Sequence, residues 1–107
     1  MTEARIRRIE KQIAKLKKEL EDIGPMRPGS LSRQYRVPKK KIGPFYQLSY
    51  MHKMKSRTEY VRPQFLSQIR SQIATYKRFK KLVEKWIELA IAHAKLTIDL
   101  QKKKDLK

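Results

Sequence analysis

The chain has 107 residues, of which 28 are Lys or Arg and 10 are Asp or Glu, so its formal net charge is +18. This length fits one small domain without a large cleft between lobes. The absence of cysteine excludes disulfide scaffolds, thiolate zinc sites and Cys nucleophiles. No apolar run approaches a membrane span, and the N-terminus does not resemble a signal peptide. We expect a cytoplasmic protein, free or nucleoid-associated, whose partner is a polyanion and not a membrane.

Charge and breaker residues divide the chain into three segments. Residues 1–24 carry seven basic and five acidic residues, whereas residues 25–62 carry ten basic residues and a single acid, Glu59. Residues 63–107 carry eleven basic and four acidic residues. Four of the five prolines lie in the central segment and the fifth, Pro63, opens the third, which indicates two helical arms around a central module, all within one folded unit.

The first segment has a regular apolar period. Its apolar side chains follow alternating spacings of three and four residues, at Ile6, Ile9, Ile13, Leu16, Leu20 and Ile23. This heptad pattern predicts a helix over residues 2–23. Thr2 suits the helix start, and Gly24 followed by Pro25 ends it. A helix with this seam requires a partner helix.

The central segment alternates like short strands. We expect strands at residues 31–36, 45–50 and 57–61, the last two forming a hairpin. Tyr46, Leu48 and Tyr50 fall on one face of the second strand. Because three strands alone are marginally stable, we expect the sheet to pack on the C-terminal helix.

The third segment predicts a long helix over residues 63–103. It begins with a narrow apolar stripe of Phe65, Leu66, Ile69, Ile73 and Tyr76. From Phe79 onward two apolar seams appear, which predicts two neighbouring helices. We expect the first arm to supply one neighbour and a second copy of the chain, as the simplest source, to supply the other. The expected fold is therefore α+β and mainly α, with a coiled-coil-like helical hairpin, a small β-hairpin or three-stranded module, and a dimeric helical bundle.

No constellation for catalysis or metal binding is visible in the sequence. The acids are scattered, and the two histidines, His52 and His93, lie in different segments. His93 lies on a packed seam, where a structural role is the better interpretation, and His52 sits in a basic loop. We expect no enzyme activity, no cofactor and no metal.

The cations form two candidate nucleic-acid-binding groups. The first lies in the central segment and comprises Arg27, Arg33, Arg36, Lys39, Lys40, Lys41, Lys53, Lys55, Arg57 and Arg62. The second clusters on one face of the long helix and comprises Arg70, Lys77, Arg78, Lys81 and Lys85. Such groups neutralise phosphates and release counterions. We expect Tyr35 and Tyr50 to be available for base stacking, and Tyr46 and Tyr60 to pack the small sheet.

Several short motifs carry a resemblance to a known kind of protein. They are Gly29-Ser30-Leu31, Tyr35-Arg36, Gly43-Pro44-Phe45-Tyr46, Leu48-Ser49, Thr58-Glu59-Tyr60-Val61 and Tyr76-Lys77-Arg78-Phe79. Across residues 26–90 the chain resembles a family of small uncharacterised prokaryotic proteins often found near mobile-element genes. Members usually carry a cysteine cluster like a zinc knuckle before the Gly-Pro-aromatic element, where this chain has residues 37–42, Val-Pro-Lys-Lys-Lys-Ile. The resemblance implies the fold and a DNA- or RNA-associated setting, without a metal.

The sequence thus predicts a non-enzymatic, homodimeric nucleic-acid-binding protein that recognises mainly phosphate backbone or shape. The pattern fits DNA and RNA, single- and double-stranded, alike. An alternative is a structural subunit of a larger nucleoprotein or ribonucleoprotein complex, in which the second seam docks on another protein. A membrane-surface binder is the weakest of the three, because the apolar arcs follow heptads suited to partner helices.

Overall fold

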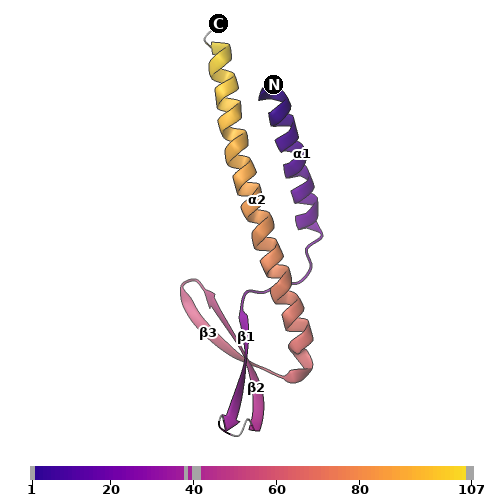
Figure 1. Cartoon of the computed structure of the whole chain (residues 1–107), viewed down its shortest axis with the longest axis vertical. Coiled ribbons are helices and arrows are strands. Elements are labelled where there is room, and N and C mark those ends of the chain that lie inside the picture. Colours follow the sequence, from indigo (N-terminus) through magenta and orange to yellow (C-terminus); the bar gives the residue numbers. More distant parts are fainter. Residues whose placement is uncertain (1, 38, 40–41, 106–107) are drawn as a thin grey trace. The chain divides into compact units, whose positions relative to one another are not determined.

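The computed structural model describes residues 2–37, 39 and 42–105. Helix α1 (Thr2–Glu21) is followed by strands β1 (Ser30–Val37), β2 (Ile42–His52) and β3 (Lys55–Val61), as Figure 1 shows. A short 3-10 turn, η2 (Pro63–Phe65), leads into helix α2 (Leu66–Asp105). The predicted α+β class is confirmed, with helices of 20 and 40 residues and a three-stranded antiparallel sheet. The chain forms two compact units, residues 1–23 with 79–107, and residues 24–78.

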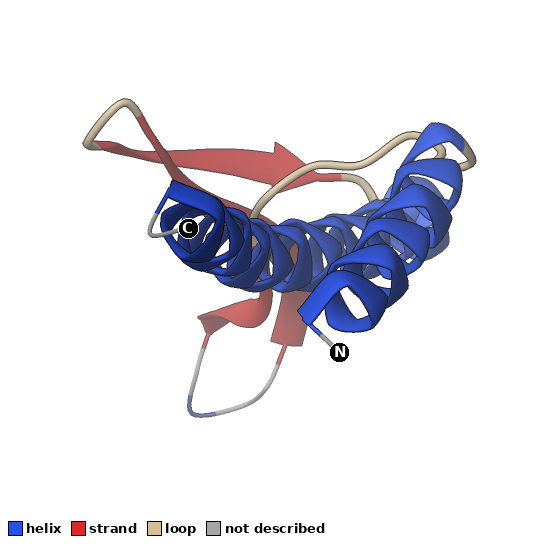
Figure 2. Cartoon of the chain, turned by 90° about the horizontal axis from the view of Figure 1, so that it is seen from above, coloured by secondary structure: helices blue, strands red, loops and turns tan. Residues whose placement is uncertain are grey.

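The first unit is a helical hairpin. Helix α1 runs antiparallel to the C-terminal part of α2, and the two helices lie side by side in Figures 1 and 2. Ile6 and Leu16 of the predicted seam are buried, as is Leu82 on α2. The Lys17 ammonium lies 5.4 Å from the centre of the Trp86 ring, a cation–π contact between the helices. The predicted pairing of the two arms is therefore confirmed, with α1 ending two residues before the expected residue 23.

The second unit contains the sheet, whose strand order is β1-β2-β3. Leu48 on β2 lies between Leu31 on β1 and Glu59 on β3 in the antiparallel register. The strands are longer than the sequence predicts, and β2 includes Pro44. A proline is tolerated there because β3 ends opposite Tyr46, so Pro44 has a neighbour on the β1 side alone.

The core of this unit joins the sheet to the start of α2. Leu48, Val61 and Ile73 are buried, and Leu48 is 0% exposed. The partly buried side chains packed around them are Leu31, Tyr46, Tyr50, Leu66 and Ile69. The expected packing of the sheet on the narrow apolar stripe of the long helix is confirmed, although Phe65 in that stripe is exposed within the turn η2. This packing gives the sheet one covered face and one open face.

Candidate nucleic-acid interface

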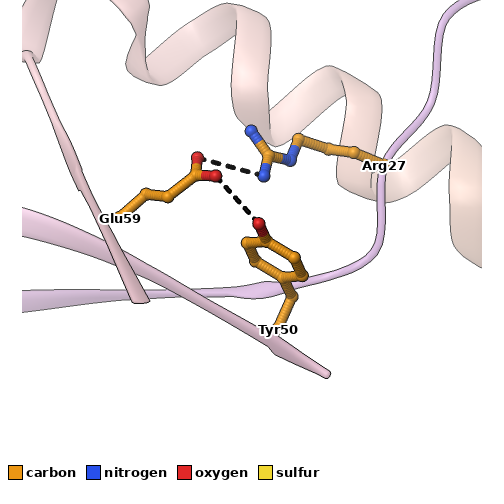
Figure 3. A network of polar contacts seen from close by, with 3 residues as sticks. All are labelled: Arg27, Tyr50 and Glu59. Carbon is orange, nitrogen blue, oxygen red and sulfur yellow. Dashed lines mark hydrogen bonds and ion pairs between the residues drawn. The ribbon is translucent and has the colours of Figure 1, made fainter. Parts of the chain in front are cut away.

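One predicted phosphate ligand, Arg27, is engaged within the protein. Its Nη2 lies 3.2 Å from Oε2 of Glu59, and its guanidinium carbon lies 5.2 Å from the centre of the Tyr50 ring. The Tyr50 hydroxyl donates to Oε1 of Glu59 at 2.9 Å, which completes the network in Figure 3. The hydroxyl of Tyr50, together with Arg27, lowers the pKa of Glu59 below its usual value. Arg27 therefore has its own counter-charge and is the least available cation of the first group.

A second arginine, Arg33, is held in place by a tyrosine hydroxyl and keeps its positive charge. Arg33 donates from Nε and Nη2 to the Tyr46 hydroxyl at 3.3 and 3.0 Å, and its guanidinium carbon lies 5.6 Å from the centre of that ring. The hydrogen bond to Tyr46 raises the pKa of Arg33 above its ordinary value. A neutral phenol orients the guanidinium but does not neutralise it, so Arg33 is positioned to meet an anion.

The remaining cations of the first group whose side chains the structure describes are exposed. They are Lys39, Lys53, Lys55, Arg57 and Arg62. Among the predicted phosphate ligands with described side chains, Arg27 is the one residue that has an ion pair. Lys40, Lys41 and the side chain of Arg36 lie outside the described residues. Lys53 occupies the two-residue turn between β2 and β3 with a positive φ of 51°, so it lies at the tip of the hairpin.

The second group of cations splits between the two units. Arg70, Lys77 and Arg78 belong to the unit that contains the sheet, and Lys81 and Lys85 belong to the helical hairpin. All five side chains are exposed. Lys85 lines a groove between α1 and α2 that also contains the carboxylates of Glu19 and Glu88. Its surroundings therefore mix both signs of charge, unlike those of the cations nearer the start of α2.

Arg70 and Lys77 line the best-defined candidate site for phosphate. They border a cleft of about 480 Å³, whose opposite side is formed by Gly29, Ser30 and Leu31. The two cations are spaced by two helical turns and so lie on the same face of α2. No described residue of this cleft is acidic. A phosphate in the cleft would meet the two cations, Arg70 and Lys77.

The aromatic residues divide between the two faces of the sheet differently from the prediction. Tyr46 packs against the core, as expected, but Tyr60 is 59% exposed, and the prediction that it packs the sheet is wrong. In the register, Tyr60 lies beside Gln47, on the face opposite Leu48. Its ring stacks with that of Phe45 at a centroid distance of 6.0 Å and an interplanar angle of 28°.

The two tyrosines named for base stacking lie on the covered face. Tyr50 packs against the core, and its hydroxyl and ring are occupied by Glu59 and Arg27. Tyr35 is half-buried and shares the face of Leu31 and Arg33 by strand alternation. The aromatic pair on the open face, Phe45 and Tyr60, was missed because the sequence does not show which residue of β3 lies beside Gln47.

Neither histidine belongs to a cluster that suits a metal ion. His52 is exposed at the end of β2, and Nε2 of His93 lies 3.8 Å from Oε1 of Glu10. Among residues 2–37, 39 and 42–105, no three His, Cys, Asp or Glu side chains gather closely enough to bind a metal. Within the same described residues, neither helix is long and apolar enough to cross a membrane.

Comparisons with known proteins return no similarity for this chain. No family model, no curated protein and no solved structure matches it. The resemblance to small prokaryotic proteins near mobile elements therefore stays a prediction.

Proposed function

We propose that this protein binds nucleic acid without catalysing a reaction, and that it contacts mainly the phosphate backbone. The observation that carries the proposal is the charge balance of the unit formed by residues 24–78. It contains thirteen Lys and Arg residues and a single acid, Glu59. That acid is engaged by Arg27 and Tyr50, so it offers little compensation to the other cations.

The proposed interface has two parts within that unit. One is the cleft with Arg70 and Lys77, and the other is the set of exposed cations of the sheet, with Arg33 oriented by Tyr46. Six contacts to duplex phosphates would give a slope of about −5 in a plot of log affinity against log salt. Affinity would then fall about 10³-fold between 50 and 200 mM salt.

A salt titration tests this proposal. Fluorescence anisotropy with a labelled duplex should give a slope of about −5 for the wild-type protein. A slope near that of one or two contacts would contradict the proposal. The double variant Arg70→Gln/Lys77→Gln should reduce the slope by about two, because each residue neutralises one phosphate.

The matched control removes two charges from the mixed-sign surface of α1. Lys11 and Lys18 are both exposed there, and that helix also carries four acids between residues 2 and 21. Lys11→Gln/Lys18→Gln lowers the net charge by the same amount as the cleft variant. Its slope should stay within about 0.5 of the wild-type value, since long-range charge effects are screened at these salt concentrations. An equal loss of slope in both variants would show that net charge alone drives binding.

The second candidate function is that of a structural subunit that docks on another protein. It is favoured by the exposed isoleucines of α2, Ile87 at 53% and Ile91 at 51% exposure. This candidate predicts weak, salt-insensitive nucleic-acid binding and a monomer in isolation. The salt titration and the measurement of oligomeric state therefore separate the two candidates.

A further inference from the structure

We propose that the open face of the sheet is a binding platform for unpaired bases of single-stranded nucleic acid, an inference that rests on the proposed function and extends it. The centre of the platform is the stacked pair of Phe45 on β2 and Tyr60 on β3. Aromatic rings on a strand bind bases by stacking, and this interaction tolerates any base because every base has a π-face.

The register places hydrogen-bonding side chains around this aromatic pair. Gln47 lies directly between Ser32 on β1 and Tyr60 on β3, and Gln34 lies beside Phe45. Amides and hydroxyls of this kind both donate to and accept from base edges. A base stacked on Tyr60 therefore has polar partners on the adjacent strand.

Charge distinguishes a nucleic acid from other occupants of this face. The one acid of the sheet, Glu59, points to the covered face, where it bonds Tyr50 and Arg27. Arg62 follows β3 directly, is exposed, and lies two residues after Tyr60 in the sequence. A protein partner would require a larger apolar surface than one aromatic pair and Met51 among serines, glutamines and Thr58. The face fits an anionic polymer with flat apolar groups.

The test compares a labelled 20-nucleotide oligothymidylate with a duplex of the same length at constant salt. Tyr60→Ala should weaken binding of the single strand about 5- to 100-fold and change duplex binding less than twofold. Tyr60→Phe keeps the ring and should stay within twofold of the wild-type affinity for both. Because Tyr60 is exposed, circular dichroism should show an unchanged fold in both variants.

Met51→Ala is the matched control on the same face, since Met51 is 67% exposed and lies away from the aromatic pair on β2. It should leave single-strand binding within twofold of the wild-type value. If Tyr60→Ala weakens neither ligand, or both equally, the platform is refuted while the phosphate interface stands. If neither ligand shows salt-dependent binding to the wild-type protein, the proposed function itself fails.

A separate observation on α2 carries a second proposal, which does not depend on nucleic-acid binding. Ile87, Ile91 and Ile98 are 53, 51 and 52% exposed, on the side of α2 turned away from the buried Leu82. Together with Ala94 they form a continuous heptad seam without a partner among the described residues. We infer that this seam binds a second copy of the chain in antiparallel orientation.

The seam is complementary to itself in antiparallel orientation and not in parallel orientation. A two-fold axis midway between positions 92 and 93 places Ile87 opposite the partner's Ile98, and Ile91 opposite the partner's Ala94. The same axis places Glu88 beside the partner's Lys95 twice, on the flank of the seam. A parallel pair would instead bring Glu84 against its own copy, and would gather the lysines of residues 102–104 from both chains.

Sedimentation equilibrium of the nucleic-acid-free protein tests the dimer. The wild-type protein should dimerise reversibly, and Ile87→Ser/Ile98→Ser should weaken dimerisation more than 100-fold while keeping its helical signal. A monomeric wild-type protein at 100 μM would refute the proposal and favour docking on another protein.

Charge reversal tests the orientation of the dimer. Glu88→Lys and Lys95→Glu should each weaken dimerisation roughly tenfold, because attraction becomes repulsion at two symmetric positions. The double variant should recover most of the wild-type affinity. Within one chain the two residues are about 10 Å apart along the helix axis, too far for direct pairing, so recovery must arise between chains. Absence of recovery would refute the antiparallel register.

Discussion

Leu48 is the most informative residue for testing how the sheet is held together. It lies on the central strand, is 0% exposed, and belongs to one buried cluster with Val61 and Ile73. Truncating a buried leucine to alanine costs about 2–5 kcal/mol through lost burial and the cavity that remains. Because several neighbours are only partly buried and are able to move inward, we expect Leu48→Ala to cost about 3 kcal/mol.

That loss is large relative to the stability of the unit that contains the sheet. Residues 24–78 number roughly 55, and typical stabilities per residue give about 3–8 kcal/mol for such a unit. Leu48→Ala should therefore remove from about two fifths to all of the stability of this unit. The helical hairpin has its own buried residues, which are Ile6, Leu16 and Leu82. The backbone amides of α1 should therefore keep their protection from hydrogen exchange in this variant.

Hydrogen exchange measured by mass spectrometry follows the two units separately. Amides of β2 and β3 should exchange about 100-fold faster in Leu48→Ala, while those of α1 change little. Met51→Ala is the control, since the side chain has similar size, lies on the same strand and is 67% exposed. It should change stability by less than about 0.5 kcal/mol. A loss below about 1 kcal/mol for Leu48→Ala, or equal effects of the two variants, would refute the assigned core.

Three further predictions concern single contacts. Gly29→Ala should lower the free energy of unfolding by about 2 kcal/mol or more in urea titrations, because its φ is +146° and a Cβ would lie 2.5 Å from Cδ1 of Leu48. Folding lowers the pKa of Glu59, chiefly because the Tyr50 hydroxyl donates a hydrogen bond to its carboxylate. The ionised Glu59 therefore stabilises the fold at pH values above its unfolded pKa, and this stabilisation is lost as the pH falls through its folded pKa. The melting temperature of the wild-type protein should exceed that of Glu59→Gln at pH 7, and the two should converge on acidification below about pH 4. Lys17→Ala should change the emission of Trp86 and cost about 0.5 kcal/mol, and an unchanged spectrum would contradict the cation–π contact.

The helices and most of the sheet were predictable because their apolar periods are unambiguous. The heptad of α1 indicated which residues face a partner, and Ile6 and Leu16 are indeed buried. Alternation in β2 likewise assigned Tyr46 and Leu48 to the covered face. These patterns are local, so they do not depend on which strand lies beside which.

The face of β3 was not predictable, because its two faces look alike in sequence. Glu59 and Val61 share one face and Tyr60 occupies the other, so apolar residues point both ways. The sequence favoured burial of Tyr60 because a small three-stranded sheet needs apolar side chains to form a core. The structure places Glu59 at the rim of the covered face instead, where Tyr50 and Arg27 supply its hydrogen bonds. That compensation comes from residues distant in sequence and is visible only in three dimensions.

The same network clarifies why the unit of residues 24–78 is a candidate for polyanion binding. Its single acid, Glu59, is engaged by Arg27 and Tyr50, so the other cations of the unit whose side chains the structure describes have no ion pair and are balanced by small counterions in the free protein. Their mutual repulsion disfavours the compact state. A phosphate backbone relieves that repulsion and releases counterions from both polymers, a gain that grows with each phosphate neutralised. A surface of mixed sign, such as that of α1, would gain far less. Uncompensated charge on one compact unit, more than net charge on the whole chain, is therefore the feature that favours a nucleic acid as the ligand.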